Sequence, residues 1–169
     1  MSINEEHRLN LVTQQSNRVF LASGDRTSEA AFECVAMPYL KELYCTAFRL
    51  LLDVGKASDA VQETYRRGCR EFDSSEWANC RMWMFQILFD SVRRARHHSD
   101  SATVSAVPLG NRKILSGMDR LPHELREVLL LVDVQRFSYA ETSTILDIGV
   151  ETVKSRIGRA RTMLYRQLS

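Results

Sequence analysis

The stretch that decides the fold is Tyr139-Ala-Glu-Thr-Ser-Thr-Ile-Leu-Asp-Ile-Gly-Val-Glu-Thr-Val-Lys-Ser-Arg-Ile-Gly-Arg-Ala-Arg161. Its pattern predicts a short helix, a tight turn with Gly149, and a second helix that is apolar on one side and basic on the other. Two helices joined in this way are typical of the helix-turn-helix, whose second helix enters the major groove of DNA. The first hypothesis is therefore sequence-specific DNA binding.

Spacing and charge along the second helix support this hypothesis. At about 100° per residue, a narrow apolar stripe is expected to pack on the preceding helices: Val153, Ile157, Ala160 and Leu164. Five basic residues and one acidic residue, Glu151, give residues 150–169 a net charge of +4, whereas the whole chain carries only +2. This concentration of positive charge suits the neutralisation of phosphates, and such binding weakens as salt rises.

Composition narrows the classes of protein to consider. The chain has 169 residues, of which 44% are hydrophobic, so it can form one medium or two small cores. It has no run of about 18 apolar residues that could span a membrane. The polar N-terminus lacks the apolar core of a signal peptide, so we expect a cytoplasmic protein. The cysteines form no CxxC pair, which predicts buried reduced thiols and neither a metal site nor a cofactor.

Helical periodicity divides the chain into four segments. Residues 1–26 are polar and are expected to form a flexible extension, whereas residues 27–98 are helical almost throughout. Residues 99–119 lack periodicity, contain proline and glycine, and predict a flexible linker. Residues 120–169 predict a second helical domain that ends in the helix-turn-helix. The expected fold class is therefore all-α, with two small helical domains joined by a flexible linker.

Local signals predict where individual helices begin. Ser28 is expected to cap the first helix, and Gly55 and Ser58 are expected to form the turn and the cap before the third. A fourth helix is expected to begin near Asn79. In the second domain, Pro122 is placed in the first turn of the opening helix, where its missing N–H has no intrahelical partner.

Three stretches carry a resemblance to a known family, and they lie in order at residues 59–65, 79–88 and 121–131. They resemble the bacterial sigma-70 family of RNA polymerase sigma factors, within its extracytoplasmic-function (ECF) group. The first is Asp59-Ala-Val-Gln-Glu-Thr-Tyr65, which resembles the core of sigma region 2. The second is Asn79-Cys-Arg-Met-Trp-Met-Phe-Gln-Ile-Leu88, which resembles the promoter-melting segment. The third is Leu121-Pro-His-Glu-Leu-Arg-Glu-Val-Leu-Leu-Leu131, which with residues 137–141 and 152–156 resembles region 4. The resemblance covers residues 30–169.

The resemblance implies a sigma factor, which is not an enzyme. Such a protein binds core RNA polymerase and directs it to promoter DNA, and an anti-sigma factor commonly holds it. The N-terminal domain then corresponds to region 2 and is expected to bind the downstream (minus-10) promoter element. The C-terminal helix-turn-helix corresponds to region 4 and is expected to bind the upstream (minus-35) element.

The same resemblance assigns residues to each role. The expected contacts to the upstream element are Thr152, Lys154, Ser155, Arg156, Gly158 and Arg159. The expected contacts to the downstream element are Trp77, Asn79, Arg81, Asp90, Arg93 and Arg94. The expected contacts to core polymerase are Asp59, Gln62, Glu63 and Arg66.

Two positions depart from the family pattern. Asp90 stands where the pattern usually has asparagine, and a carboxylate cannot donate a hydrogen bond and repels phosphate. Gly158 stands where a larger side chain is common, so one contact to the upstream element is expected to be missing or filled by water.

Two other functions are compatible with an all-α chain of this kind. A sigma mimic would bind an anti-sigma factor without touching DNA, but it has no need of a basic recognition helix. A plain helix-turn-helix repressor would carry a ligand-binding or dimerisation domain, and the polar Gln62-Glu63 surface and the lack of an obvious pocket count against it. The sequence shows no Ser/His/Asp set, phosphate loop or metal set, so an enzyme is not expected.

Overall fold

The computed structural model describes residues 26–72, 79–97, 117–118 and 120–168, and these residues form helices and turns without a strand. The expected all-α class is therefore confirmed. In chain order the elements are α2 (Arg26–Ala36), η1 (Met37–Tyr39), α3 (Leu40–Leu51), α4 (Val54–Glu71), α5 (Cys80–His97), α7 (His123–Leu129), η4 (Leu130–Val134), α8 (Tyr139–Leu146) and α9 (Val150–Leu168). Within these ranges, no helix is both long and apolar enough to cross a lipid bilayer.

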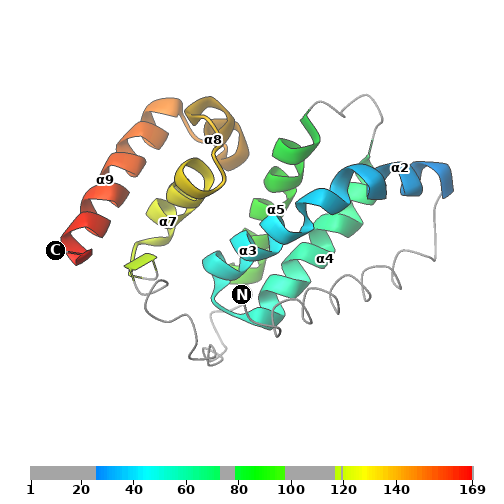
Figure 1. Ribbon diagram of the computed structural model, residues 1–169, viewed down its shortest axis with the longest axis horizontal. Helices are drawn as coiled ribbons and strands as arrows, with labels where there is room; N and C mark the ends of the chain where they lie inside the picture. Colours follow the sequence, from blue (N-terminus) through cyan, green and yellow to red (C-terminus); the bar gives the residue numbers. More distant parts are fainter. Residues whose placement is uncertain (1–25, 73–78, 98–116, 119, 169) are drawn as a thin grey trace.

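Helices α2–α5 form an N-terminal bundle (Figure 1), in which α4 contacts α2, α3 and α5. Its centre holds fully buried side chains such as Phe32, Leu43, Val61 and Phe89. A glycine allows the close approach of α4 to α2, because a Cβ at Gly68 would lie 2.8 Å from Cζ of Phe32. Burial of these apolar side chains, each worth roughly 1.5–3 kcal/mol, is the main force that holds the bundle together.

The starts of two helices differ from the expectation. Helix α4 begins at Val54, and its cap is Asp53, whose Oδ1 accepts the Lys56 N–H at 2.9 Å. Ser58 therefore lies inside the helix, because the left-handed backbone of Leu52 (φ 55°) reverses the chain early and Asp53 then takes the capping position. Helix α2 likewise begins at Arg26, before the expected cap Ser28.

The C-terminal helices follow the expected order, and two details differ. Pro122 immediately precedes α7, and the same helix continues as the π-helical segment η4. The turn between α8 and α9 takes its left-handed residue from Asp147 (φ 54°), whereas Gly149 has an ordinary backbone. Asp and Asn tolerate this conformation better than most residues, so the turn does not depend on the glycine.

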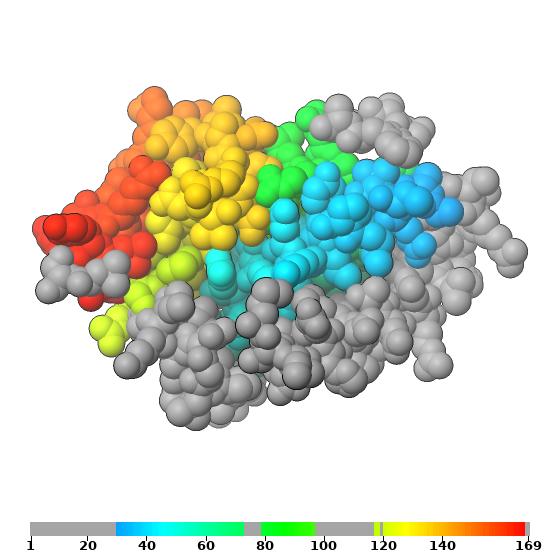
Figure 2. All heavy atoms as spheres, in the orientation of Figure 1, coloured from blue at the N-terminus to red at the C-terminus, as the bar shows by residue number. Residues whose placement is uncertain are grey.

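The two groups of helices pack against each other. Helix α8 contacts α5 and α7 contacts α3, and Figure 2 shows these parts touching along the visible face. One core cluster joins Phe85 and Leu88 of the N-terminal bundle to Leu131, Phe137 and Ile145 of the C-terminal part. The expected extension at residues 1–26 lies almost wholly outside the described residues, as do Trp77 and most of the expected linker at residues 99–119.

Candidate functional site

The outward face of α9 is the most open of the predicted contact surfaces. The stripe Val153, Ile157 and Ala160 is buried as predicted, and Leu164 is half-buried. The opposite side of the helix is therefore turned to solvent. The predicted residues exposed there are Thr152, Lys154, Ser155, Gly158 and Arg159.

Ion pairs divide the basic residues of α9 into two groups. Arg156 is half-buried and binds Oε2 of Glu124 on α7 at 3.0 Å, and Arg161 binds Oδ1 of Asp133 on η4 at 2.6 Å. Both tie the helix to its own domain, and the hydrogen bond to Asp133 raises the pKa of Arg161. Arg159 forms no ion pair with a described residue, so its guanidinium is available to an outside ligand.

Lys154 and Gly158 lie on the same open face. The ammonium of Lys154 donates to Oε1 of Glu151 at 2.7 Å, and this hydrogen bond raises the pKa of the lysine. Both side chains are exposed, so the pair is weak and a phosphate can displace the carboxylate. A Cβ at Gly158 would meet no described atom within 4 Å. The missing side chain therefore leaves room for a ligand to approach the helix backbone.

Local structure fixes the orientation of this face. Ser138 caps α8 by accepting the Glu141 N–H, and Oε2 of Glu141 accepts the Ser138 N–H at 2.7 Å. This reciprocal capping box satisfies two helix-end donors, and its hydrogen bonds lower the pKa of Glu141. Helix α8 then packs on α9 and presents it at the surface.

The residues predicted to contact the downstream element fall into two places. Asp90, Arg93 and Arg94 lie together near the C-terminal end of α5, and Arg94 is exposed. Oδ1 of Asp90 lies 3.5 Å from Nη2 of Arg93, and its other oxygen lies 4.0 Å from Nη1 of Arg67. The carboxylate thus neutralises part of this basic cluster.

Arg81 lies at the other end of α5 and points elsewhere. Its guanidinium binds Oε2 of Glu42 at 3.0 Å and the backbone carbonyl of Gln135 at 2.8 Å. It also lies over the ring of Phe137, at 4.2 Å from the centroid. The structure does not bring it together with Arg93 and Arg94. Asn79, just before α5, is exposed.

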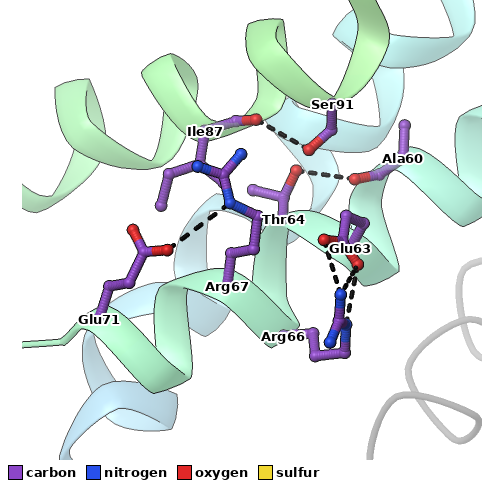
Figure 3. A network of polar contacts seen from close by, with 8 residues as sticks. All are labelled: Ala60, Glu63, Thr64, Arg66, Arg67, Glu71, Ile87 and Ser91. Atoms are coloured by element: carbon purple, nitrogen blue, oxygen red, sulfur yellow. Dashed lines mark hydrogen bonds and ion pairs between the residues drawn. The ribbon is translucent and has the colours of Figure 1, made fainter. Parts of the chain in front are cut away.

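The spacing of the predicted polymerase contacts places all four on one side of α4, and Figure 3 shows two of them, Glu63 and Arg66. Glu63 and Arg66 pair at 2.6 Å, and the Gln62 amide donates to Oγ of Ser58 at 3.4 Å. Asp59 and Arg66 are exposed. Figure 3 shows the Glu63–Arg66 pair pointing away from α5, whereas the Arg67 side chain points toward it. The polar surface is therefore available to a partner.

Sequence reasoning missed the residues that hold Arg81. Glu42, Gln135 and Phe137 come from α3 and from the turn before α8, at separations of up to 56 positions from Arg81 along the chain. Such pairs follow no helical period, so only homologous sequences or a structure could have revealed them. Arg67, which links α4 to Asp90, was missed for the same reason.

The cysteines and other potential ligands offer no competing site. The described residues contain no group of three or more His, Cys, Asp or Glu side chains able to hold a metal ion. No disulfide joins the four cysteines, all of which lie among the described residues; Cys34 is exposed, contrary to the expectation of burial, and Cys80 is buried. Burial raises the pKa of the Cys80 thiol, which keeps it protonated and unreactive.

Comparison with known proteins identifies the family. The family model "Sigma-70, region 4" matches residues 111–164. The chain is 32% identical over 145 residues to the ECF RNA polymerase sigma factor EcfG of Rhodopseudomonas palustris (strain TIE-1), covering 76% of this chain and 78% of that protein. It is 28% identical to SigM, an ECF sigma factor of Mycobacterium tuberculosis (strain Erdman), over 92% of this chain and 86% of that one.

A solved structure shows the same fold. It is the sigma factor RpoE in complex with the anti-sigma factor NepR, from Bartonella quintana. The TM-score is 0.68 at 27% identity, and the match covers 82% of this chain and 96% of the solved one. The chain therefore belongs to the ECF group of RNA polymerase sigma factors.

Proposed function

We propose that this sigma factor binds core RNA polymerase and directs it to promoters by contacting two DNA elements with separate parts of the chain. The observation that carries the proposal is the outward face of α9, which is basic, exposed and held rigidly by a buried stripe. A helix presented in this way fits the major groove, where base edges are distinguishable.

We assign the contact with the upstream element to α9. Thr152 and Ser155 supply hydroxyl groups, and Lys154 and Arg159 supply charged donors, all on one exposed side. Arg pairs with guanine through two parallel hydrogen bonds, so Arg159 is the proposed main determinant of sequence preference. Arg156, half-buried against Glu124, is proposed to position the helix and to reach at most a phosphate.

We assign the contacts with the downstream element and with the polymerase to the N-terminal bundle. Arg93 and Arg94 are placed to follow the phosphates of an opened strand along the end of α5. Asp59, Gln62, Glu63 and Arg66 form the proposed polymerase contact, on the polar side of α4. Carboxylates and amides at a protein interface set register and partner choice more than affinity.

An anti-sigma factor is the proposed regulatory partner, since RpoE was solved bound to one. The proposed role is regulatory and involves no catalysis by the chain and no cofactor. A sigma mimic that never touches DNA is disfavoured, because it would not need Lys154 and Arg159 exposed on the same face.

The test is transcription in vitro with core polymerase on a library of promoters randomised at both elements. Wild-type protein is expected to select sequence at each element. The double variant Lys154→Ala/Arg159→Ala is expected to lose selection upstream and to keep it downstream. Lys41→Ala/Arg120→Ala, which removes two exposed charges from other surfaces, serves as the matched control. Upstream selection that survives in the first variant contradicts the assignment, and absence of any transcript contradicts the proposed function.

A further inference from the structure

Arg136 occupies an unfavourable backbone conformation in the turn between η4 and α8. Its φ is 63°, in the left-handed region that a residue with a Cβ rarely adopts. Glycine adopts this region without steric cost, and asparagine and aspartate tolerate it. An arginine here therefore makes the fold less stable than a glycine would, and a strained residue of this kind points to a role outside the fold itself.

The neighbours of Arg136 hold the turn in place. Gln135 and Phe137 are both buried. The Gln135 N–H donates to the carbonyl oxygen of Leu130 at 2.8 Å, and the Phe137 N–H donates to that of Leu131 at 3.0 Å. Between these two anchored residues, the Arg136 side chain is exposed. The turn therefore presents a guanidinium to solvent from a backbone that is fixed on both sides.

The carboxylates on either side of Arg136 in the sequence bind other groups. Asp133 accepts two hydrogen bonds from Arg161, at 2.6 and 3.1 Å. Oε2 of Glu141 accepts the Ser138 N–H at 2.7 Å. No ion pair joins Arg136 to another of the residues that the structure describes. Its charge is therefore available to an outside partner.

The turn leads directly into the part of the chain that lies beside the basic residues of α9. Tyr139, the first residue of α8, packs against a core cluster that includes buried residues of α9. Glu151 and, to a lesser degree, Tyr139 raise the pKa of Lys154. Asp133 and, to a lesser degree, Tyr139 raise the pKa of Arg161. Figure 1 shows α8 beside the first turns of α9, so the turn before α8 lies at the edge of the proposed DNA-binding surface.

This position suits a contact with the DNA backbone. When the second helix of a helix-turn-helix enters the major groove, the first helix crosses the sugar–phosphate backbone. The turn that precedes α8 is then placed beside the phosphates that border the groove. A guanidinium is always charged, and its planar set of donors matches the oxygens of a phosphate.

We propose that Arg136 binds a phosphate beside the upstream element and thereby fixes the position of α9 in the groove. The inference rests on the proposed function. Phosphate contacts set register and orientation and carry no direct sequence information. The loss of Arg136 is therefore expected to lower affinity by the same factor for strong and weak upstream sequences, whereas the loss of Arg159 changes the preference among them.

The test compares two substitutions of Arg136 in the full chain bound to core polymerase. The probe is a labelled duplex with the upstream sequence selected in the library experiment, and anisotropy is measured over a range of salt concentrations. Arg136→Gly is expected to raise the melting temperature by a few degrees. It is nevertheless expected to weaken binding roughly five- to tenfold near about 0.1 M salt, and to reduce the slope of log affinity against log salt by about 0.9. Arg136→Lys keeps the charge and is expected to keep the slope.

Arg120→Asn is the matched control, because Arg120 is exposed in the turn before α7 and its loss removes the same charge. A Cβ at the nearby Gly117 would lie 3.4 Å from Leu164, so this turn lies near the C-terminal end of α9, away from α8. The control is expected to leave the slope unchanged. Equal changes of slope for Arg120→Asn and Arg136→Gly would indicate a general effect of charge and would overturn the contact, as would an unchanged slope for Arg136→Gly.

Neutral phosphates locate the contact on the DNA. Single methylphosphonates beside the upstream element are expected to weaken wild-type binding at one or two positions, by a factor similar to that of Arg136→Gly, and to leave the variant unaffected there. Identical losses for both proteins at every position would overturn the proposal. A wild-type complex that does not distinguish the selected duplex from a scrambled one would instead contradict the proposed function, whatever the Arg136 variants do.

Discussion

The guanidinium of Arg156 lies 3.0 Å from the carboxylate of Glu124, so a residue of α9 is bound to the first turn of α7. Only 23% of the Arg156 side chain is exposed. Three residues further along, Arg159 is exposed and has no ion pair among the described residues. Two arginines of one helix thus lie in different surroundings, and charge alone does not distinguish them.

Single substitutions should distinguish the proposed DNA contact of Arg159 from the stabilising ion pair of Arg156. Arg159→Ala is expected to lower affinity for the upstream duplex roughly tenfold and to relax its sequence preference, with little change in stability. Arg156→Ala is expected to cost up to about 1 kcal/mol of unfolding free energy and to affect affinity less. Fluorescence anisotropy at several salt concentrations and thermal unfolding measure the two effects. Glu124→Ala should reproduce the stability loss of Arg156→Ala, and a larger affinity loss at Arg156 than at Arg159 would reverse the assignment.

Gly158 offers a substitution in which stability and binding move in opposite directions. A glycine inside an exposed helix costs roughly 1 kcal/mol relative to alanine, and a Cβ at this position would touch no described neighbour within 4 Å. Gly158→Ala is therefore expected to raise the melting temperature. The added methyl group lies on the proposed DNA-binding side, so affinity for the upstream duplex is expected to fall. A variant that gains both stability and affinity would show that DNA does not approach α9 closely here.

Asp90 is expected to weaken binding to the opened strand. Its carboxylate lies 3.5 Å from Arg93 and 4.0 Å from Arg67, and it carries a charge that repels phosphate. Asp90→Asn should strengthen binding of the polymerase-bound chain to a single-stranded downstream oligonucleotide roughly fivefold, from about 1 kcal/mol of removed repulsion. Glu33→Gln on α2 makes the same change in net charge and should have little effect. Equal gains from both variants would indicate a general effect of charge.

The turn between α8 and α9 should tolerate changes at glycine better than its sequence suggests. Asp147 has φ of 54°, so Asp147→Gly is expected to stabilise the fold by about 0.5–1 kcal/mol. Gly149 has an ordinary φ, and a Cβ there would lie 3.8 Å from Oγ1 of Thr152, which is normal contact. Gly149 directly precedes α9, a position where alanine is less favourable than glycine, so Gly149→Ala is expected to cost no more than about 1 kcal/mol. Denaturant unfolding measures both, and a strongly destabilised Gly149→Ala would contradict this account of the turn.

The capping box predicts a specific dependence of stability on pH. Hydrogen bonds from Ser138 lower the pKa of Glu141 from its ordinary value of 4.5. A carboxyl group whose pKa is lower in the folded state stabilises the fold above its ordinary pKa, and this contribution disappears as pH falls through the folded value. Glu141→Gln should therefore be less stable than wild type at pH 7, and the two should converge as the pH falls below the ordinary value of 4.5 and through the lower pKa of the folded state. A constant difference across this range would show that the carboxylate charge has no part in the cap.

Some features of the fold could be predicted because they depend on neighbours in sequence. The stripe Val153, Ile157 and Ala160 follows the helical period, and all three side chains are buried as expected. The start of α4 could not be predicted in the same way. Both Asp53 and Ser58 are good caps by residue type, and the choice between them depends on the reversal at Leu52.

The candidate site likewise combines features that depend on neighbouring residues with features that depend on distant ones. Which side of α9 is basic and open follows from the sequence, because a helix fixes the relative direction of residues three and four apart. The ion pairs of the α9 arginines depend on carboxylates elsewhere in the chain, such as Glu124 for Arg156. The partners of Arg81 lie 39 and 54 positions away, on α3 and in the turn before α8.

The sequence by itself determined an all-α chain, its family and which sides of α9 are apolar and basic, because helical period and short motifs are properties of contiguous residues. Only the tertiary structure decided that Arg81 joins the two groups of helices and that Asp147 shapes the turn. Those outcomes depend on distant groups meeting in space, where burial requires each polar atom to find a partner and leaves few arrangements that satisfy them all.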